Sequence, residues 1–123
     1  MRQFRPAGWH SVTPRLFTPD VAGLVEFLRA VFDAHGDVRS GAPSEIRIGD
    51  SIVMISDGGG LRAAQPAFLY VYVEDADATY GQAMAAGARS IEAPMDTPYG
   101  DRRATVEDDW GNSWQIATFR GTQ

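Results

Sequence analysis

The chain has 123 residues, of which 44% are hydrophobic and 22% charged, a composition that fits one folded domain and excludes a disordered chain. Its net charge of −5 makes nucleic acids and anionic membranes poor partners, because both require a basic surface. It has no cysteine, which excludes disulfides, thiolate nucleophiles and cysteine-ligated metal clusters. We see no signal peptide and no membrane-spanning stretch, so we expect a cytoplasmic protein.

The first half of the chain predicts a strand, a helix and two further strands. Residues 13–20, TPRLFTPD, form a short apolar run that ends at an aspartate. Apolar residues at helical spacing follow, so we expect Asp20 to cap a helix that stops at Gly36, with His35 in its last turn. The alternating runs at 44–50 and 49–56 then predict two strands.

The second half repeats this order. Residues 68–75, FLYVYVED, again form an apolar run that ends at an aspartate, and a helix is expected from Asp75 to Gly87. The runs at 102–108 and 111–118 predict strands, and GNSWQIAT aligns without a gap with GDSIVMIS at 49–56. We therefore predict a single domain, 1–123, in which each half has a strand, a helix and two or three strands. Module one is 10–57, a glycine-rich linker is 58–66 and module two is 67–120.

Four stretches carry a resemblance to a known family and together span nearly the whole chain: TPRLFTPDVAGLVEFLRAVF, IRIGDSIVMISD, LYVYVEDADATYGQAMAAGA and YGDRRATVEDDWGNSWQIATF. The chain resembles the vicinal oxygen chelate superfamily, which includes glyoxalases, bleomycin-resistance proteins and dioxygenases. The resemblance implies an α+β fold of two βαβββ modules that form a cup-shaped mixed sheet, with helices on the convex side and a ligand on the concave side. It implies no single reaction, because this fold has isomerases, dioxygenases, thiol transferases and antibiotic binders among its members.

The resemblance also implies where a metal would bind. Metal-dependent members place ligands seven residues before each strand-ending aspartate and four residues after the glycine of each last strand. Here these positions are Thr13, Val53, Phe68 and Gln115. Valine and phenylalanine cannot coordinate a cation, and a hydroxyl with one amide is a poor ligand pair for a transition metal. We therefore predict no metal and no cofactor.

The remaining candidate metal ligands have ordinary structural explanations. His10 is expected on the opposite strand face from Thr13, and His35 at a helix end, where the dipole favours a cation. The acidic residues Glu107, Asp108 and Asp109 are expected in a solvated turn. An atypical metal site that uses His10 with Glu107 remains an alternative.

Strand parity predicts which side chains line the concave face. Leu16, Leu69, Val71, Trp114 and Ile116 are expected to pack under the helices, and Thr105, Glu107, Glu45 and Arg47 to extend the concave face. On that face we also expect Ser51, Val53, Ala117 and eight predicted ligand contacts: Arg15, Phe17, Phe68, Tyr70, Tyr72, Arg103, Ser113 and Gln115. Aromatic walls with a few polar groups are typical of ligand pockets, although a solvated face or a dimer contact would have the same composition.

Two classes of function remain open. The first is a metal-free binding protein of the bleomycin-resistance type, which holds a planar or aromatic organic molecule with an acidic or carbonyl group, as in drug or antibiotic sequestration. The second is an enzyme of the same superfamily: either a metal-independent one with Glu107 or Glu45 as general base, or an atypical metal-dependent lyase, isomerase or dioxygenase-like enzyme. No catalytic residue is assigned. We expect a homodimer, because exposed strand edges are commonly covered by a partner.

Overall fold

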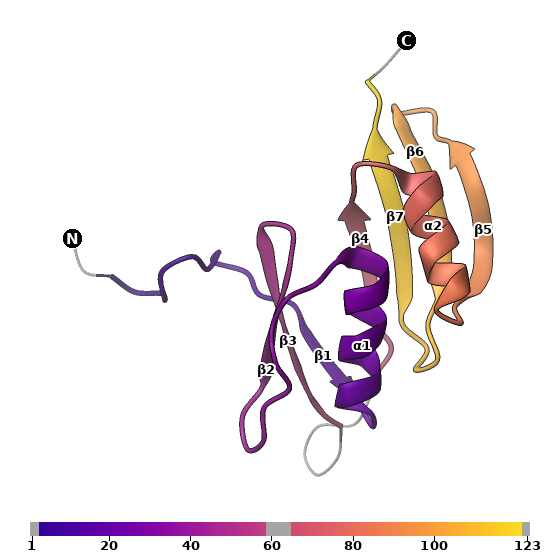
Figure 1. Ribbon diagram of the computed structural model, residues 1–123. Coiled ribbons are helices and arrows are strands. Elements are labelled where there is room, and N and C mark those ends of the chain that lie inside the picture. Colours follow the sequence, from indigo (N-terminus) through magenta and orange to yellow (C-terminus); the bar gives the residue numbers. More distant parts are fainter. Residues whose placement is uncertain (1–2, 59–64, 122–123) are drawn as a thin grey trace. The chain divides into compact units, whose positions relative to one another are not determined.

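The computed structural model describes residues 3–58 and 65–121, and it divides into two compact units (Figure 1). The first unit is built from the residues up to Gln65 except Ala30–Phe32, and the second from Ala30–Phe32 and the residues from Pro66 onward. The unit boundary falls in the predicted linker 58–66, of which residues 59–64 lie outside the described residues. The elements are β1 (Arg15–Thr18), α1 (Val21–Phe32), β2 (Ser44–Ile48), β3 (Ser51–Asp57), β4 (Phe68–Tyr72), α2 (Ala76–Ala85), β5 (Arg89–Asp96), β6 (Asp101–Glu107) and β7 (Ser113–Phe119).

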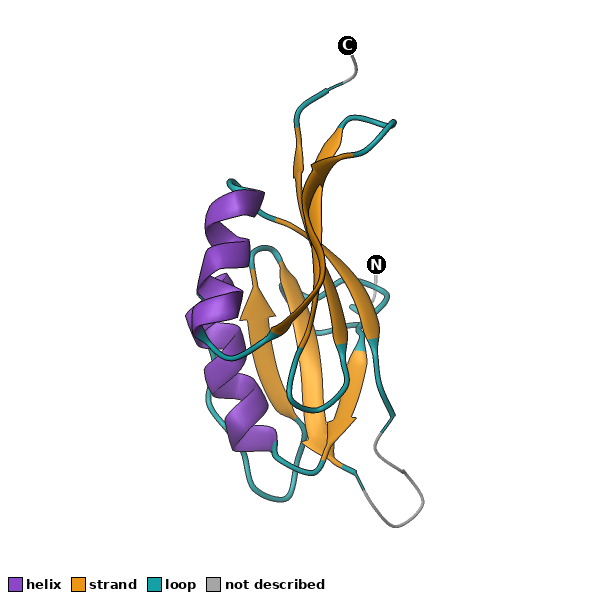
Figure 2. Ribbon diagram, turned by 90° about the vertical axis from the view of Figure 1, so that its right-hand side faces the viewer, coloured by secondary structure: helices purple, strands orange, loops and turns teal. Residues whose placement is uncertain are grey.

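The first unit has a mixed three-stranded sheet in the order β1-β3-β2. Strand β1 is parallel to β3, and β2 is antiparallel to it. Alternate residues of these strands are buried, with Leu16, Ile46 and Ile55 at most 2% exposed. Figure 2 shows the helix of this unit lying along one side of the sheet. Helix α1 also has a buried apolar side, which includes Leu24 and Leu28 at 0% exposure.

Helix α1 begins where the sequence predicts but ends earlier. The Asp20 side chain accepts a hydrogen bond from the Gly23 N–H at 2.9 Å, as an N-cap does. The helix ends at Phe32, because Asp33 adopts the left-handed conformation at φ 54°. The prediction that His35 lies in the last helical turn is therefore wrong, and its backbone instead pairs with that of Arg47. Gly36 is not the helix stop: at φ 133° it lies so close to β2 that a Cβ would be 2.4 Å from the Glu45 carbonyl oxygen.

The second unit has a four-stranded sheet in the order β4-β7-β6-β5. Strand β4 is parallel to β7, and the other neighbours are antiparallel. Helix α2 contacts β5, β6 and β7 and covers one face of the sheet (Figure 1). Asp75 caps α2 by accepting from the Ala78 N–H at 3.1 Å, as predicted. The core under α2 includes Ala104, Val106, Trp114 and Ile116, all 0% exposed.

Strand β5 accounts for the main difference between the units. Its residues are mostly exposed, it pairs with β6 alone among the described strands, and two register shifts interrupt that pairing. In the described part of the first unit, the segment after α1 forms a single bridge at His35 instead of a strand. The predicted α+β fold of two βαβββ-like modules with mixed sheets is thus confirmed. The second unit has all four strands of such a module, and the described part of the first unit has three. No helix among the described residues is long and apolar enough to cross a membrane.

The turns before β3 and β7 differ in length, and this corrects the predicted alignment of the two halves. Gly49 and Asp50 form a two-residue turn, whereas residues 108–112 separate β6 from β7. Arg15 of β1 and Tyr70 of β4 are at matching positions of the two units. Arg15 pairs with Met54 and Tyr70 pairs with Gln115, so Met54, and not Val53, corresponds to Gln115. The gap-free alignment of 49–56 with 111–118 was wrong by one residue. A shift of one residue moves every side chain of β3 to the other face of its sheet. Ser51 and Val53 were therefore assigned to the wrong face: Val53 is 4% exposed and belongs to the face of the sheet that carries Ile55.

Candidate functional site

The face of the second sheet opposite α2 carries six of the eight predicted ligand contacts, and we call it the tyrosine face. In the strand register, Phe68 is opposite Ser113, and Gln115 lies between Tyr70 and Thr105. Alternate residues of three strands form this face: Phe68, Tyr70, Tyr72, Asp101, Arg103, Thr105, Glu107, Ser113, Gln115, Ala117 and Phe119. The structure thus brings Phe68, Tyr70, Tyr72, Arg103, Ser113 and Gln115 together.

Large aromatic side chains on the tyrosine face are exposed. Phe68 and Phe119 are each 66% exposed and Tyr72 is 61% exposed. Met95 of β5, which pairs with Arg103, is also exposed. Single exposed apolar residues are common in proteins, whereas a group of them on one sheet face makes that face a candidate binding surface.

A buried carboxylate joins the two tyrosines. Asp101 is 2% exposed, and its Oδ2 accepts hydrogen bonds from the Tyr70 hydroxyl at 2.6 Å and the Tyr72 hydroxyl at 2.9 Å. The two rings meet edge to face, with centroids 5.4 Å apart. Burial and the hydrogen bond to Asp101 raise the pKa of Tyr70 well above its ordinary value, and the Tyr99 hydroxyl adds to this shift. The hydrogen bond to Asp101 also raises the pKa of Tyr72.

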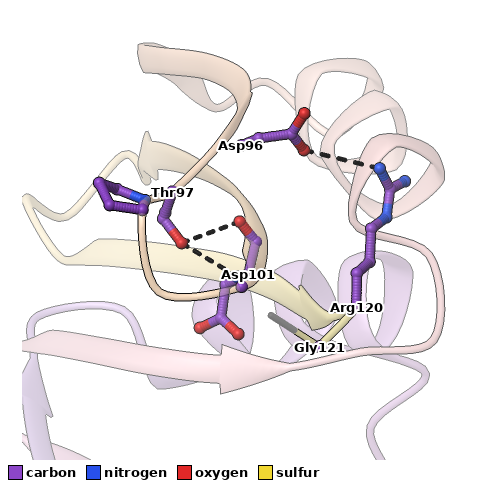
Figure 3. A pocket seen from close by; sticks show the side chains of 7 residues that line it. Asp96, Thr97, Asp101, Arg120 and Gly121 are labelled. Atoms are coloured by element: carbon purple, nitrogen blue, oxygen red, sulfur yellow. Dashed lines mark hydrogen bonds and ion pairs between the residues drawn. The ribbon is translucent and has the colours of Figure 1, made fainter. Parts of the chain in front are cut away.

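The backbone of Asp101 is fixed by the hairpin that precedes it. The Thr97 hydroxyl accepts from the Asp101 N–H and donates to the Asp101 carbonyl oxygen, both at 3.0 Å (Figure 3). These residues line a pocket of about 490 Å³, together with Asp96, Pro98, Gly100, Arg120 and Gly121. Figure 3 shows the Arg120 side chain beside Asp96, with which it forms an ion pair at 3.6 Å. The pocket and the tyrosine pair therefore share Asp101.

Arg103 lies next to this group and already has partners. Its Nη1 donates to the Tyr99 hydroxyl at 2.7 Å and its Nη2 to Glu92 Oε1 at 3.3 Å. Its Nε is buried and has no hydrogen-bond partner among the described residues. The guanidinium charge is thus balanced by a carboxylate of the neighbouring strand.

Gln115 belongs to the same hydrogen-bond network. The Thr105 hydroxyl donates to Glu92 Oε1 at 2.7 Å, and Gln115 Nε2 donates to Thr105 Oγ1 at 3.4 Å. This long contact places the Gln115 amide at the end of a polar chain that begins at Arg103. Gln115 is therefore a half-buried amide on a sheet face, next to side chains that orient one another.

Arg15 and Phe17 belong to the first unit, on the face of its sheet opposite the core, which we call the arginine face. Arg15 Nη2 donates to Ser56 Oγ at 3.1 Å, and the guanidinium lies 5.0 Å from the centroid of the Phe17 ring. Arg15 also lines a pocket of about 740 Å³ beside the start of α1. The strand register places Glu45, which forms an ion pair with Arg39, on the same face as Arg15.

Sequence reasoning missed two residues of the tyrosine face, Asp101 and Phe119, and the two partners of its Arg103, Tyr99 and Glu92. Asp101 follows Gly100 and reads as part of a turn, although it has the parity of Arg103 and Thr105. If the alternation of β6 had been extended two residues before Arg103, it would have placed Asp101 on the tyrosine face. Glu92 lies in the edge strand β5, whose irregular register gives no clear alternation.

The acidic turn after β6 is exposed at Asp109, as predicted, but Asp108 is buried and Glu107 is the last residue of β6. Asp108 is 4% exposed, and its Oδ1 accepts from the backbone N–H groups of Trp110 and Asn112, both at 2.9 Å. Its Oδ2 accepts from Asn112 Nδ2 and Trp114 Nε1, also at 2.9 Å. Glu107 forms an ion pair with Arg89. Asp108 therefore organises the turn and holds the buried Trp114.

The side chains at the four metal positions of the family do not fit a metal. With Met54 in place of Val53, the set is Thr13, Met54, Phe68 and Gln115, which offers a hydroxyl, a thioether, a phenyl ring and an amide. Transition metals in proteins favour imidazole, carboxylate and thiolate. Within residues 3–58 and 65–121, no group of three His, Cys, Asp or Glu could hold a metal, so His10 and Glu107 belong to none. That the protein binds no metal stays a prediction.

The fold and the sequence both match known proteins. Residues 9–116 match the Glyoxalase/Bleomycin resistance protein/Dioxygenase superfamily. An uncharacterized protein of Mycobacterium bovis is 28% identical over 123 residues, which cover 86% of this chain and 81% of that protein. Two crystal structures share the fold at 22% identity. TioX from Micromonospora sp. ML1 has a TM-score of 0.74, with 93% of this chain and 99% of that chain covered. The fosfomycin resistance protein FosX from Mesorhizobium loti has a TM-score of 0.67, with 89% and 91% covered.

The chain therefore belongs to the glyoxalase/bleomycin resistance protein/dioxygenase superfamily, the vicinal oxygen chelate superfamily. Proteins of this superfamily bind small molecules. The structural matches, at 22% identity, show the fold and not the ligand.

Proposed function

We propose that the protein binds a planar aromatic small molecule on the tyrosine face. The observation that carries this proposal is the set of exposed rings, Phe68, Tyr72 and Phe119, around a hydrogen-bonded polar centre. Small-molecule sites combine apolar area with a few oriented polar groups, and this face has both. Sequestration of a drug or antibiotic is one form of this function, and a fosfomycin resistance protein is among the proteins that share this fold.

The aromatic side chains favour a flat ligand. Aromatic pairs contribute about 0.5–1.5 kcal/mol beyond the burial of area, so contacts with two or three rings favour a planar molecule over a globular one. Tyr70 and Tyr72 cannot turn freely, because both hydroxyls are bound to Asp101. This preorganisation lowers the entropic cost of binding. Arg15 and Phe17 of the arginine face are proposed as ligand contacts in their own right.

A screen of planar aromatic fragments by ligand-observed NMR would test the proposal. We expect Phe68→Ala and Tyr70→Ala each to weaken the binding of a hit by about three- to tenfold, the loss of one aromatic contact. Trp110→Ala, in the turn before β7, is the control and should change the affinity less. Arg15→Ala tests the arginine face separately. Hits whose affinity is unaffected by both tyrosine-face substitutions would contradict the proposal.

An enzyme of the same superfamily is the alternative, and no contact among the described residues favours it over binding. The two candidate general bases, Glu107 and Glu45, form ion pairs with Arg89 and Arg39. The tyrosine face presents rings and hydrogen-bonded side chains that already have partners, and this arrangement suits recognition of a ligand. Binding without chemical conversion of the ligand is therefore the function that these contacts support best.

The homodimer also stays a proposal. In the described sheets, β1 and β2 are the edges of the first unit and β4 and β5 those of the second. Exposed edges have unpaired backbone groups that a second chain can cover. Light scattering at micromolar concentration should give twice the mass of the chain, and the mass of a single chain would contradict the dimer.

A further inference from the structure

The hydrogen-bond direction at the tyrosine pair limits what a ligand can offer there. Both phenol hydrogens point to one atom, Asp101 Oδ2, at 2.6 and 2.9 Å. A phenol has one hydrogen to donate, so each oxygen has only lone pairs left for another partner. Tyr72 is 61% exposed and Tyr70 37% exposed, so a ligand can reach both side chains, and the Tyr99 hydroxyl also interacts with that of Tyr70.

The surroundings of the pair are also rich in acceptors. Asp101 is a buried carboxylate whose Oδ2 accepts from two neutral phenols, and Glu92 lies on the adjoining part of the face. The rings of Tyr70 and Tyr72 add the negative faces of their π systems, which attract cations. Arg103 does not reverse this balance, because its charge is paired with Glu92 and its side chain is only 17% exposed.

We infer that the group of the ligand next to Tyr70 and Tyr72 is a hydrogen-bond donor, best a protonated amine or amidine attached to an aromatic ring. This inference rests on the proposed function and names the ligand class of the same site. It differs from the acid or carbonyl compound that the sequence led us to expect. That expectation came from Arg15, which lies on the arginine face, whereas the tyrosine face selects the opposite polarity.

Two flat probes of the same ring system and opposite charge would test the inference: protonated 2-naphthylmethylamine and 2-naphthoate. Their affinities would be measured by calorimetry at neutral pH in 0.5 M salt, which screens the attraction of any cation to a chain with net charge −5. We expect the amine to bind about tenfold more tightly, as one charge-assisted hydrogen bond of about 1.4 kcal/mol would give.

Substitution of Asp101 should change the sign of this preference. Asp101→Leu removes the acceptor and frees both phenol hydrogens, so the pair could donate to a carboxylate and the naphthoate should become the tighter probe. Asp101→Asn, a smaller change of shape, should reduce the preference for the amine to about threefold or less. Tyr80→Phe is the control, because the Tyr80 hydroxyl contacts Ser90, away from the tyrosine face, and it should leave the ratio unchanged.

The outcomes separate the inference from the proposed function. If both probes bind with equal affinity, or the naphthoate binds better to the unchanged protein, the inference is wrong and aromatic binding stands. If the preference for the amine persists in both Asp101 variants, it arises elsewhere and the inference is wrong. If neither probe binds, the proposed function fails and the inference with it.

Discussion

At matching positions of the two sheets, the first unit has Arg15 beside Met54, and the second has Tyr70 beside Gln115. One residue further along, both units have aliphatic pairs, Leu16 with Ile55 and Val71 with Ile116. The helix-facing positions are restricted by packing, because a change in volume there costs stability. The opposite faces are free of that restriction, so the same scaffold carries an arginine face in one unit and a tyrosine face in the other.

The turns before β3 and β7 differ in a similar way. The first is a two-residue turn whose Gly49 has a positive φ of 58°, as tight hairpins require. The second is longer and is organised by the buried Asp108, which accepts four hydrogen bonds. The short turn depends on backbone conformation, and the long turn depends on a side chain.

The largest expected effect on stability comes from mutations in the two turns before β3 and β7. Asp108→Ala should lower the free energy of unfolding by about 3 kcal/mol or more, because it leaves buried donors such as Trp114 Nε1 unsatisfied. Asp50→Ala, in the exposed turn of the first unit, is the matched control and should cost about 0.5 kcal/mol or less. Urea denaturation measures both. Equal losses would show that Asp108 does not organise its turn.

A pH titration would sharpen the comparison of the two faces. The pKa of Tyr70 and of Tyr72 is raised above 10.0 in the folded protein, so the folded state keeps protons that the unfolded state loses. The resulting stability is present below pH 10 and is lost as the pH rises through the folded pKa values. We expect the free energy of unfolding to fall above about pH 10, and to fall less in Asp101→Asn.

Phenolate absorbance gives the matched readout for this prediction. Tyr70 and Tyr72 should ionise later than an ordinary tyrosine, and Asp101→Asn should bring their ionisation to lower pH. The arginine face has no tyrosine, so Arg15→Ala should leave the titration unchanged. Identical titration curves for Asp101→Asn and the unchanged protein would show that Asp101 does not hold the phenols.

The smallest effect concerns the two helices. Helix α1 buries large side chains such as Leu24 and Leu28, whereas α2 buries the small Ala76, Thr79 and Ala83. Gly81 is on the exposed side of α2, and an added Cβ would meet nothing within 4 Å. Gly81→Ala should therefore raise the stability by about 0.5–1 kcal/mol, the usual gain in a helix interior. A loss in thermal denaturation would mean that α2 needs this glycine.

Much of the fold could be predicted from the sequence because its signals are local. Alternation located β4 and β7, and the aspartates Asp20 and Asp75 gave the helix starts. The third strand expected after the second helix, β5, was not located in the sequence, because an exposed edge strand with a proline has no alternating pattern. The site was predicted in part: parity gave the aromatic side chains correctly within β4. Parity failed for Val53, because the sheet face of each β3 side chain depends on the length of the turn between β2 and β3.

The polar centre of the site was missed for a different reason. Asp101 meets Tyr70 and Tyr72 across 31 and 29 residues of sequence, and nothing local marks an aspartate after a glycine as buried. Asp108 was likewise assigned to a solvated turn, although its four donors bury it. Burial of a polar group depends on partners from other segments, which a pattern within one segment does not contain.

Binding on the tyrosine face is tested most directly by a backbone NMR titration of the ¹⁵N-labelled protein with protonated 2-naphthylmethylamine. We expect the amide shifts to change most in β4, at the start of β6 from Asp101, and in β7, with smaller changes in β2 and β3. Shift changes confined to the strands of the first unit, or no changes at saturating probe, would contradict binding on the tyrosine face.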